Sequence, residues 1–272
     1  MSRSLLAQSI GRAEERLIVE DTFATAKSKS LHLRPIGDVI VELGKSFVGM
    51  EYMPGTLELP GEEKLVVCFD GFDCVTLCET LLALARCVKL EHQSYNQYCQ
   101  ELQRIRYREG IIDGYPSRLH YFSDWIYDNE RKGIVHDITV SLGGKAFAKR
   151  IYFMSSHVSS YAKLKDHPQF IDTIRKQEKE ISQRKRTFLR KSDLKIHEKE
   201  IQSGDLLAFT SSKEGLDVAH TGIAIREQGA LKLLHAPQAG EQVQITKESL
   251  NEYLSRRSQM TGLLVARPLD PS

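Results

Sequence analysis

The feature that most restricts the fold of this chain is the order in which two patterns of apolar residues occur along it. Apolar residues recur at three- and four-residue steps over 4–19, 36–48 and 74–88, and a polar helical pattern covers 168–186. Such spacing is typical of helices with one buried face. The last seventy residues instead alternate short apolar runs with turns, as antiparallel strands do. Helices first and an antiparallel sheet last predict an α+β fold with one core.

The C-terminal part of the chain contains most of the predicted strands. They cover residues 206–210, 221–226, 230–235 and 262–267, with a helix near 246–257 before the last. The apolar run 65–69 predicts one more buried strand, and residues 94–107 predict a second central helix. Residues 110–160 are irregular and rich in glycine, aromatic residues and histidine.

The residues between the second and third C-terminal strands set the register of a hairpin. If the turn is the two-residue 228–229, Gly222 lies opposite His235. His220 and His235 are then diagonal neighbours on one face, about 7–8 Å apart at the backbone. An unbulged three-residue turn would put them on opposite faces, so the prediction depends on one residue of register.

Charge and composition exclude several classes of protein. The 272 residues include 38 Lys and Arg against 36 Asp and Glu, which gives no general reason to expect nucleic acid or an acidic membrane as a partner. Residues 161–200 are locally basic, but acids are mixed in and aromatic interleaving is absent, as on a solvated helix face. No run approaches the ~20 apolar residues of a membrane span.

The N-terminal residues do not form a signal peptide, because no apolar stretch precedes Glu14 and Glu15. We therefore expect either a cytoplasmic protein or a chain given without its leader. The five cysteines are an odd number in a long chain and do not form a disulfide framework, which predicts free thiols.

Cys74 stands where a loop becomes a helix. Unpaired N–H groups and the positive end of the helix dipole meet there, and both favour a thiolate. The alternative is a buried structural cysteine, the interpretation that we give to Cys68, Cys78, Cys87 and Cys99.

A thiol nucleophile needs a base and a group that orients the base. Of the nine histidines, His220 and His235 lie on the predicted hairpin. His220 is the candidate base toward Cys74, and His235 is the candidate that holds its ring. Gly222, without a side chain, would leave room beside the base.

Ordered segments of the chain resemble a known family of hydrolases. Asp73-Cys74, His220 to Ala224 and His235-Ala236-Pro237 resemble the NlpC-type cell-wall hydrolases, which are papain-like. Within them the chain is most similar to the N-acetylmuramoyl-L-alanine amidase-like family. The segments that carry this similarity are 49–58, 72–79, Ser117 to Tyr121 with Trp125, 203–205 and 215–220. They fall in order over residues 35–267.

The resemblance implies a fold and a catalytic set. The expected fold is one papain-like domain over residues 1–272, with residues 90–200 as a helical and loop insertion that carries substrate-binding segments. The implied roles are Cys74 as nucleophile, His220 as base and His235 as the third member. Tyr52 is implied as an oxyanion donor together with the Cys74 backbone N–H.

The resemblance also implies a substrate, the amide between N-acetylmuramic acid and L-alanine in small peptidoglycan fragments. Arg118, His120 and Tyr121 could bind the sugar or the alanine carboxylate, Tyr121 or Trp125 could stack on the sugar, and Asp217 could contact ligand or cap a turn. Arg118 and Tyr121 could equally brace their loop. We expect a monomer without cofactor or metal ion, in the periplasm or cell envelope.

Three alternatives remain open. The same fold could cut the γ-D-glutamyl–diaminopimelate bond. A zinc site could form from Cys74, Cys78, His220 and His235, although the 15-residue step between the histidines is unlike a zinc knuckle. A binding domain without activity is the third alternative.

Overall fold

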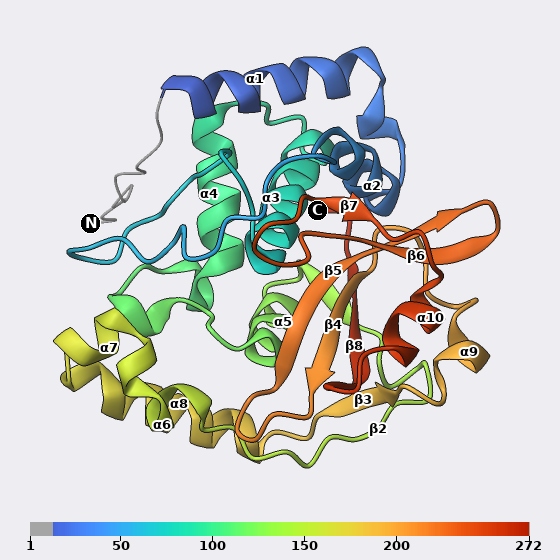
Figure 1. Ribbon diagram of the computed structural model, residues 1–272. Helices are drawn as coiled ribbons and strands as arrows, with labels where there is room; N and C mark the ends of the chain where they lie inside the picture. The colour runs from blue at the N-terminus through green and yellow to red at the C-terminus, as the bar shows by residue number, and fades with distance from the viewer. Residues whose placement is uncertain (1–12, 272) are drawn as a thin grey trace.

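Four helices form the N-terminal part of the computed structural model, which describes residues 13–271 (Figure 1). They are α1 (Ala13–Ser28), α2 (Ile36–Ser46), α3 (Cys74–Lys89) and α4 (Tyr95–Arg106). α3 is central, because it contacts α1, α2, α4 and the sheet. All of its residues from Thr76 to Val88 are buried, so this helix is the axis of the core.

An antiparallel sheet follows, in the order β2-β3-β8-β4-β5-β6-β7, with β1 also paired to β8. Its strands are β1 (Val135–Asp137), β2 (Lys145–Ala146), β3 (Thr187–Arg190), β4 (Leu206–Ser211), β5 (Val218–Glu227), β6 (Ala230–His235), β7 (Gln244–Ile245) and β8 (Met260–Pro268). Every residue of β4 is buried, because both faces of the sheet are covered.

The two faces of the sheet belong to two hydrophobic clusters. On one face Ile223 and Leu234 pack with α3 and α4. On the other face Leu207 and Leu233 pack with α10 (Leu250–Ser255). The fold is therefore α+β, as predicted, with helices on both sides of an antiparallel sheet.

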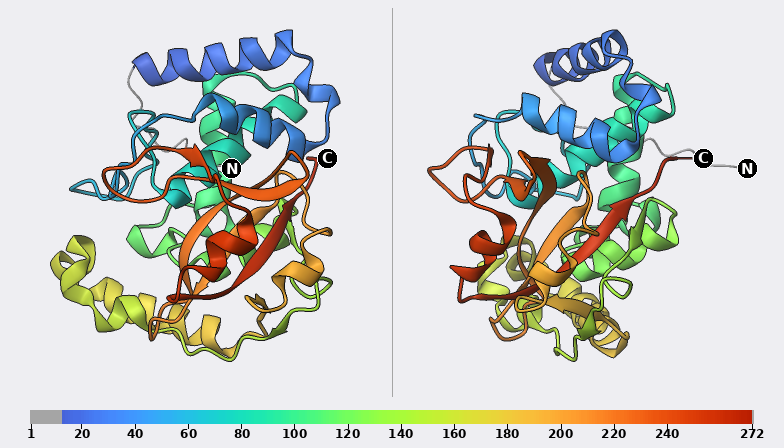
Figure 2. Two further views of the ribbon diagram at one scale, coloured as in Figure 1. Left: turned by 45° about the vertical axis from the view of Figure 1, so that its right-hand side comes forward. Right: turned by 90° about the vertical axis from the view of Figure 1, so that its right-hand side faces the viewer.

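A third hydrophobic cluster is formed by helices that lie, in sequence, between the N-terminal helices and the C-terminal strands. It joins Tyr121 to residues of α6 (Phe153–Ser156), α7 (Ala162–Asp166) and α8 (Gln169–Gln183). These helices lie at the end of the molecule opposite α1 in both turned views (Figure 2). The stretch 90–200 is not all peripheral, since α4 packs on α3 and both β1 and β3 pair with β8.

Several predicted elements are confirmed and some are corrected. The helices at 36–48, 74–88, 94–107 and 168–186 and the four C-terminal strands are present, whereas α10 is shorter than 246–257. α1 is shifted from the predicted 4–19, and residues 4–12 of that prediction lie outside the described residues. Elements that the sequence did not predict are α5 (Phe122–Arg131), α6, α7, α9 (Leu194–His197), β1, β2, β3, β7 and the 3₁₀ turns Leu31–Leu33, Arg108–Gly110, Tyr115–Ser117 and Val158–Ser160.

The predicted strand at 65–69 is wrong. Leu65, Val67 and Phe69 are buried against the helices, but the segment joins no named strand. The carbonyl of Val66 instead accepts a hydrogen bond of 2.6 Å from the guanidinium of Arg106 on α4. The run is apolar because it is buried. A short apolar run occurs in buried loops as well as in strands, so its composition does not distinguish the two.

Within residues 13–271, none of the helices combines the length and apolar character needed to cross a membrane.

Candidate active site

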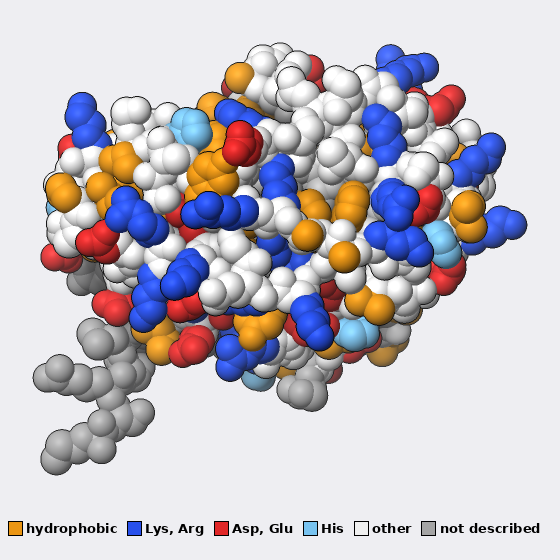
Figure 3. Space-filling view, turned by 90° about the horizontal axis from the view of Figure 1, so that it is seen from below, with side chains coloured by type: hydrophobic (Ala, Val, Ile, Leu, Met, Phe, Trp, Pro, Cys, Tyr) orange, Lys and Arg blue, Asp and Glu red, His pale blue; other side chains and the backbone are white. Residues whose placement is uncertain are grey.

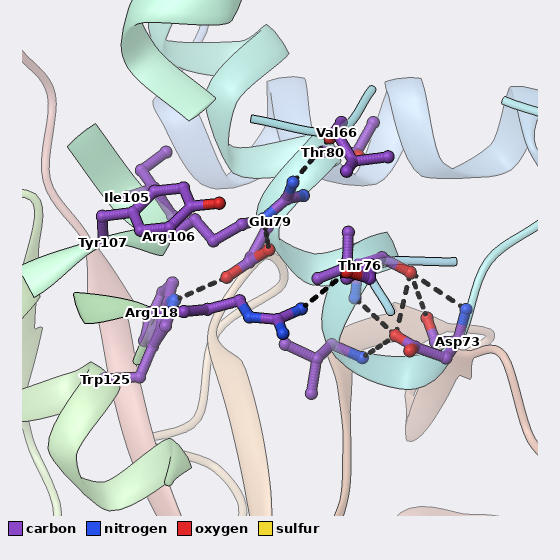
Figure 4. A network of polar contacts seen from close by, with 12 residues as sticks. Val66, Asp73, Thr76, Glu79, Thr80, Ile105, Arg106, Tyr107, Arg118 and Trp125 are labelled. Atoms are coloured by element: carbon purple, nitrogen blue, oxygen red, sulfur yellow. Dashed lines mark hydrogen bonds and ion pairs between the residues drawn. The ribbon is translucent and has the colours of Figure 1, made fainter. Parts of the chain in front are cut away.

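Cys74 is the first residue of α3, and a capping box fixes its position (Figure 4). The Asp73 carboxylate accepts the N–H groups of Val75 at 3.0 Å and Thr76 at 2.7 Å, and the Thr76 hydroxyl accepts the N–H of Asp73 at 3.0 Å. In the described part of the chain the N–H of Cys74 itself has no acceptor. One backbone donor of the first turn therefore remains available beside the sulfur.

A buried ion pair anchors α3 at Glu79, five residues after Cys74. The Glu79 carboxylate accepts hydrogen bonds from Arg106 Nε at 2.6 Å and from Trp125 Nε1 at 3.2 Å (Figure 4). All three side chains are buried. The start of α3 is thereby held against α4 and α5, which limits where the Cys74 sulfur can lie.

Strand β5 also holds the start of α3. The Thr221 hydroxyl donates to the carbonyl of Cys74 at 2.7 Å. The oxygen of this hydroxyl lies 3.8 Å from Cys78 Sγ. Neighbouring strand residues point to opposite faces. The side chain of His220 accordingly lies on the other face, with its ring 6.0 Å from that of Phe209.

The hairpin register agrees with the prediction from the two-residue turn. Gln228 and Gly229 both have positive φ, 51° and 81°, as the turn type favoured in two-residue hairpins requires. Ile223 pairs with Leu234, so the next position, Gly222, faces the backbone of His235. A Cβ on Gly222 would lie 2.9 Å from the Leu234 carbonyl oxygen and 3.0 Å from His235 Cβ. The strands can approach this closely only because residue 222 is glycine.

The two hairpin histidines form a direct hydrogen bond. His220 Nε2 lies 2.8 Å from His235 Nδ1, with the rings 5.0 Å apart and 79° inclined. The ring of Tyr253 on α10 packs edge-on against His235 at 5.3 Å. The hydrogen bond fixes the His220 ring and leaves its Nδ1 as the nitrogen not bound to His235.

Burial in this region favours neutral forms of all three groups. Burial, with a smaller contribution from the Asp73 carboxylate, raises the pKa of the Cys74 thiol to about 11. Burial lowers the pKa of His220 to about 4 and of His235 to about 3, and the Arg257 cation acts in the same direction. The sequence led us to expect a lowered thiol pKa at the helix N-terminus. The structure differs because burial disfavours the thiolate and because the cap that positions Cys74 is itself an anion.

Cys74 and His220 lie in one region without a direct contact. No hydrogen bond joins Cys74 Sγ to a ring nitrogen of His220 within residues 13–271. The two are connected by Thr221, the residue next to His220, whose hydroxyl donates to the Cys74 carbonyl. Burial raises the Tyr253 pKa to about 12, against the Arg257 cation and with a contribution from Cys74.

Tyr52 lies beside the start of α3. It pairs with Phe72 in an isolated bridge, and its N–H donates to the Glu241 carbonyl at 2.9 Å. Burial raises the pKa of its phenol to about 12, and the charges of Cys74 and Asp73 add to the effect. The Tyr52 hydroxyl is therefore a neutral hydrogen-bond donor close to Cys74.

An open pocket of about 410 Å³ lies beside His220. Its lining includes Pro237, Tyr253 and Arg257, and the Arg257 guanidinium stacks 3.4 Å above the Tyr253 ring. Neither Tyr253 nor Arg257 is among the residues predicted from the sequence to form the site. Their four-residue spacing at the end of the predicted helix was a usable signal, because such residues share one helix face.

The candidates in the segment 115–125 are engaged with the protein itself. Arg118 donates to Glu58 at 2.8 Å and also pairs with Glu63 at 3.3 Å, and it is 5% exposed. His120 Nε2 lies 2.9 Å from the Tyr115 carbonyl. Burial lowers the His120 pKa to about 3.

Tyr121, Trp125 and Asp217 are likewise part of the scaffold. The Tyr121 hydroxyl donates to Glu178 at 2.6 Å, and Asp217 accepts the N–H of Ser123 at 2.8 Å, which caps the start of α5. Trp125 is fully buried and stacks on Phe122, so neither face of its indole is open to a sugar. The structure thus joins His220 to His235, binds the neighbouring Thr221 to the Cys74 carbonyl and pairs the backbone of Tyr52 with Phe72, whereas these other residues lie in the supporting walls.

A second cavity, of about 1130 Å³, is separate from these residues. It is lined by α8 and by residues 148–152, and four cations surround it: Lys149, Arg150, Arg175 and Lys179. Figure 3 views this underside, over which Lys and Arg side chains gather. None of the predicted catalytic residues lines this cavity.

The structure offers no support for the zinc alternative. In the described residues no group of three or more His, Cys, Asp or Glu is arranged to hold a metal ion. The five cysteines are free thiols, as predicted.

Solved structures similar to this chain indicate its class, and a family profile identifies its family. A Bacteroides uniformis protein described as an N-acetylmuramoyl-L-alanine amidase has a similar structure, with 36% identity and a TM-score of 0.82 over 86% of this chain and 98% of the other. A proposed xylanase of Bacteroides fragilis is 38% identical with a TM-score of 0.78, over 82% and 98% of the two chains. A Legionella pneumophila protein, 20% identical over 94% and 95% with a TM-score of 0.70, shares the fold.

The profile of the AmiA-like family, described as N-acetylmuramoyl-L-alanine amidase-like, matches residues 42–262. The chain therefore belongs to this family, and amidase-like, peptidoglycan-related hydrolysis is the activity that the family indicates. No curated protein sequence matches the chain.

Proposed function

We propose that the protein is a cysteine amidase that hydrolyses the amide between N-acetylmuramic acid and L-alanine in small peptidoglycan fragments. The observation that carries this proposal is the 2.8 Å bond between His220 and His235, with His220 adjacent in sequence to Thr221, whose hydroxyl binds the Cys74 carbonyl at 2.7 Å. This bond orients an imidazole whose Nδ1 is left for the thiol. Family membership supplies the substrate class.

The mechanism follows from the neutral resting state. Because the Cys74 pKa is raised and the His220 pKa is lowered, His220 takes the thiol proton as the sulfur attacks the lactyl carbonyl. The Cys74 sulfur and the His220 imidazole then come within hydrogen-bonding distance in the substrate complex, as is common for catalytic hydrogen bonds. His220 Nε2–H donates to His235 Nδ1 in this tautomer, and the resulting imidazolium is held in place.

The remaining steps complete acyl transfer. The Tyr52 hydroxyl and the Cys74 N–H stabilise the oxyanion, and each such donor is worth ~3–4 kcal/mol of the barrier. Collapse of the intermediate breaks the C–N bond, and His220 returns its proton to the leaving amine. Water then hydrolyses the thioester to give the free lactyl carboxylate and regenerate the thiol.

The arrangement also supports the finer placement in the NlpC-type papain-like enzymes. In these enzymes the nucleophile opens a helix and its partners lie on successive strands, which is the arrangement of Cys74 on α3, His220 on β5 and His235 on β6. A glycosidase, by contrast, needs two carboxyl groups across its cleft. Glu241 is the one acidic side chain that lines the pocket beside His220.

The test is release of L-alanine from N-acetylmuramoyl-L-alanine by the wild type and by Cys74→Ala. We expect release by the wild type and a loss of at least about 10³-fold in the variant. Equal release by both proteins would exclude Cys74 as the nucleophile. Mass spectrometry of digested muropeptides identifies the bond, because cleavage of γ-D-glutamyl–diaminopimelate gives fragments of different mass.

A further inference from the structure

We infer that the pocket beside His220 is a carboxylate-binding site and that Arg257 binds the carboxylate of the amino acid released by the reaction. The inference rests on the proposed function. It extends that function by assigning a residue to the leaving-group side of the substrate.

Arg257 is held in a defined position but is not neutralised. Its guanidinium stacks 3.4 Å above the Tyr253 ring, and Nη1 donates to the Tyr253 carbonyl at 2.8 Å. Lys191 Nζ holds the Arg257 carbonyl at 3.0 Å. Within residues 13–271 no Asp or Glu forms an ion pair with Arg257, whereas the buried Arg106 pairs with a carboxylate. Stacking leaves most of the in-plane N–H groups of Arg257 able to bind a ligand.

The pocket has the polarity and position that a carboxylate requires. Its lining includes the cation Arg256 and the polar Gln238, besides Arg257. Glu241 is the one acidic side chain in the lining, and its carboxylate accepts hydrogen bonds from Gln238 at 2.7 Å and Gln244 at 3.1 Å. A guanidinium matches the planar geometry of a carboxylate.

The chemistry places the leaving amino acid on this side of the cleft. His220 returns a proton to the leaving nitrogen, so that nitrogen must lie next to the imidazole. In L-alanine the carboxylate is separated from the nitrogen by one carbon atom. A carboxylate attached to a nitrogen at His220 therefore falls in the pocket that His220 and Arg257 both line.

Binding there would also strengthen the base. The Arg257 cation contributes to the lowered pKa of both histidines. A bound carboxylate offsets that cation and raises the pKa of His220 toward its ordinary value. A substrate that carries the carboxylate thus improves the base that acts on it.

The test compares two substrates that differ only in charge, N-acetylmuramoyl-L-alanine and N-acetylmuramoyl-L-alaninamide. We expect the wild type to prefer the acid by about 10- to 100-fold in kcat/KM, the range of a hydrogen bond to a charged group. Arg257→Gln should bring the ratio close to one by slowing only the acid, and Arg257→Lys should retain part of it. The matched control is Arg131→Gln, because Arg131 lies over the Tyr127 ring at 5.8 Å on α5. This control should keep the wild-type ratio.

The outcomes separate the two proposals. If Arg257→Gln slows both substrates equally, or if the wild type shows no preference, the inference is overturned and the amidase proposal stands. If the wild type cleaves neither compound, the amidase proposal fails, and calorimetry of Cys74→Ala with the same two compounds decides the inference. Tighter binding of the acid that Arg257→Gln abolishes supports the site, and equal binding of acid and amide overturns it.

Discussion

The β5–β6 hairpin and the segment 115–125 both contain polar residues that the sequence placed in the site, but they use them differently. In the hairpin, His220 and His235 bond to each other and His220 lines an open pocket. In the segment, Arg118 and Tyr121 bond to Glu58 and Glu178 of the surrounding walls. A polar residue in a family motif can therefore serve the scaffold, and the hydrogen-bonding capacity left unused distinguishes the two cases.

The largest expected difference between the two regions is in turnover. We expect His220→Ala to lower kcat by about 10³- to 10⁴-fold, because the thiol then has no base. His120→Gln changes a half-buried histidine of the segment, and it should keep kcat within about threefold of wild type. Steady-state kinetics on N-acetylmuramoyl-L-alanine measures both. Similar losses in the two variants would remove the distinction between the regions.

A smaller effect is expected at the oxyanion donor. Tyr52→Phe should lower kcat by about 10²-fold with little change in KM, since its hydroxyl acts only on the charged intermediate. Tyr127→Phe, at a half-exposed tyrosine on α5, is the control. A higher KM with unchanged kcat would assign Tyr52 to ground-state binding instead.

The hairpin histidines should make stability depend on pH. The pKa of His220 is about 4 in the folded protein and ~6.5 when unfolded, so the unfolded state binds more protons between these values. The contribution of neutral His220 to the unfolding free energy is complete above about pH 6.5. It decreases by up to about 3 kcal/mol as the pH falls toward 4. The unfolding free energy, measured by urea denaturation at several pH values between 4 and 7, should change less with pH in His220→Asn than in wild type. The same pH dependence in both proteins would mean that His220 is not buried in its neutral form.

The smallest effect concerns stability in the segment. Tyr121→Phe removes the hydroxyl that donates to Glu178 and accepts the N–H of Met154, which should cost about 1–3 kcal/mol of unfolding free energy. Turnover per folded molecule should stay at the wild-type value. A selective loss of turnover with unchanged stability would return Tyr121 to the substrate site.

The sequence predicted those parts of the molecule that local rules govern. Helical spacing defined α3, and the two-residue turn at 228–229 defined which faces His220 and His235 occupy. These predictions succeeded because periodicity and turn chemistry act within a few residues.

What the sequence could not predict depends on partners distant in the chain. The run 65–69 resembled a strand, yet Arg106 and the helices determine its environment. The raised pKa of Cys74 follows from burial as well as from the adjacent Asp73. The role of Trp125 depends on Glu79, 46 residues away. Such contacts are set by tertiary packing, and single-sequence patterns do not contain them.

The central claim is that Cys74 and His220 act as one catalytic unit, and a double-mutant comparison tests it most directly. The kcat of Cys74→Ala, His220→Ala and the double variant would be measured on N-acetylmuramoyl-L-alanine. If the thiol and the imidazole act as one unit, the double variant loses no more activity than the more impaired single variant. Losses that multiply in the double variant, or a single variant that retains wild-type turnover, would contradict the account.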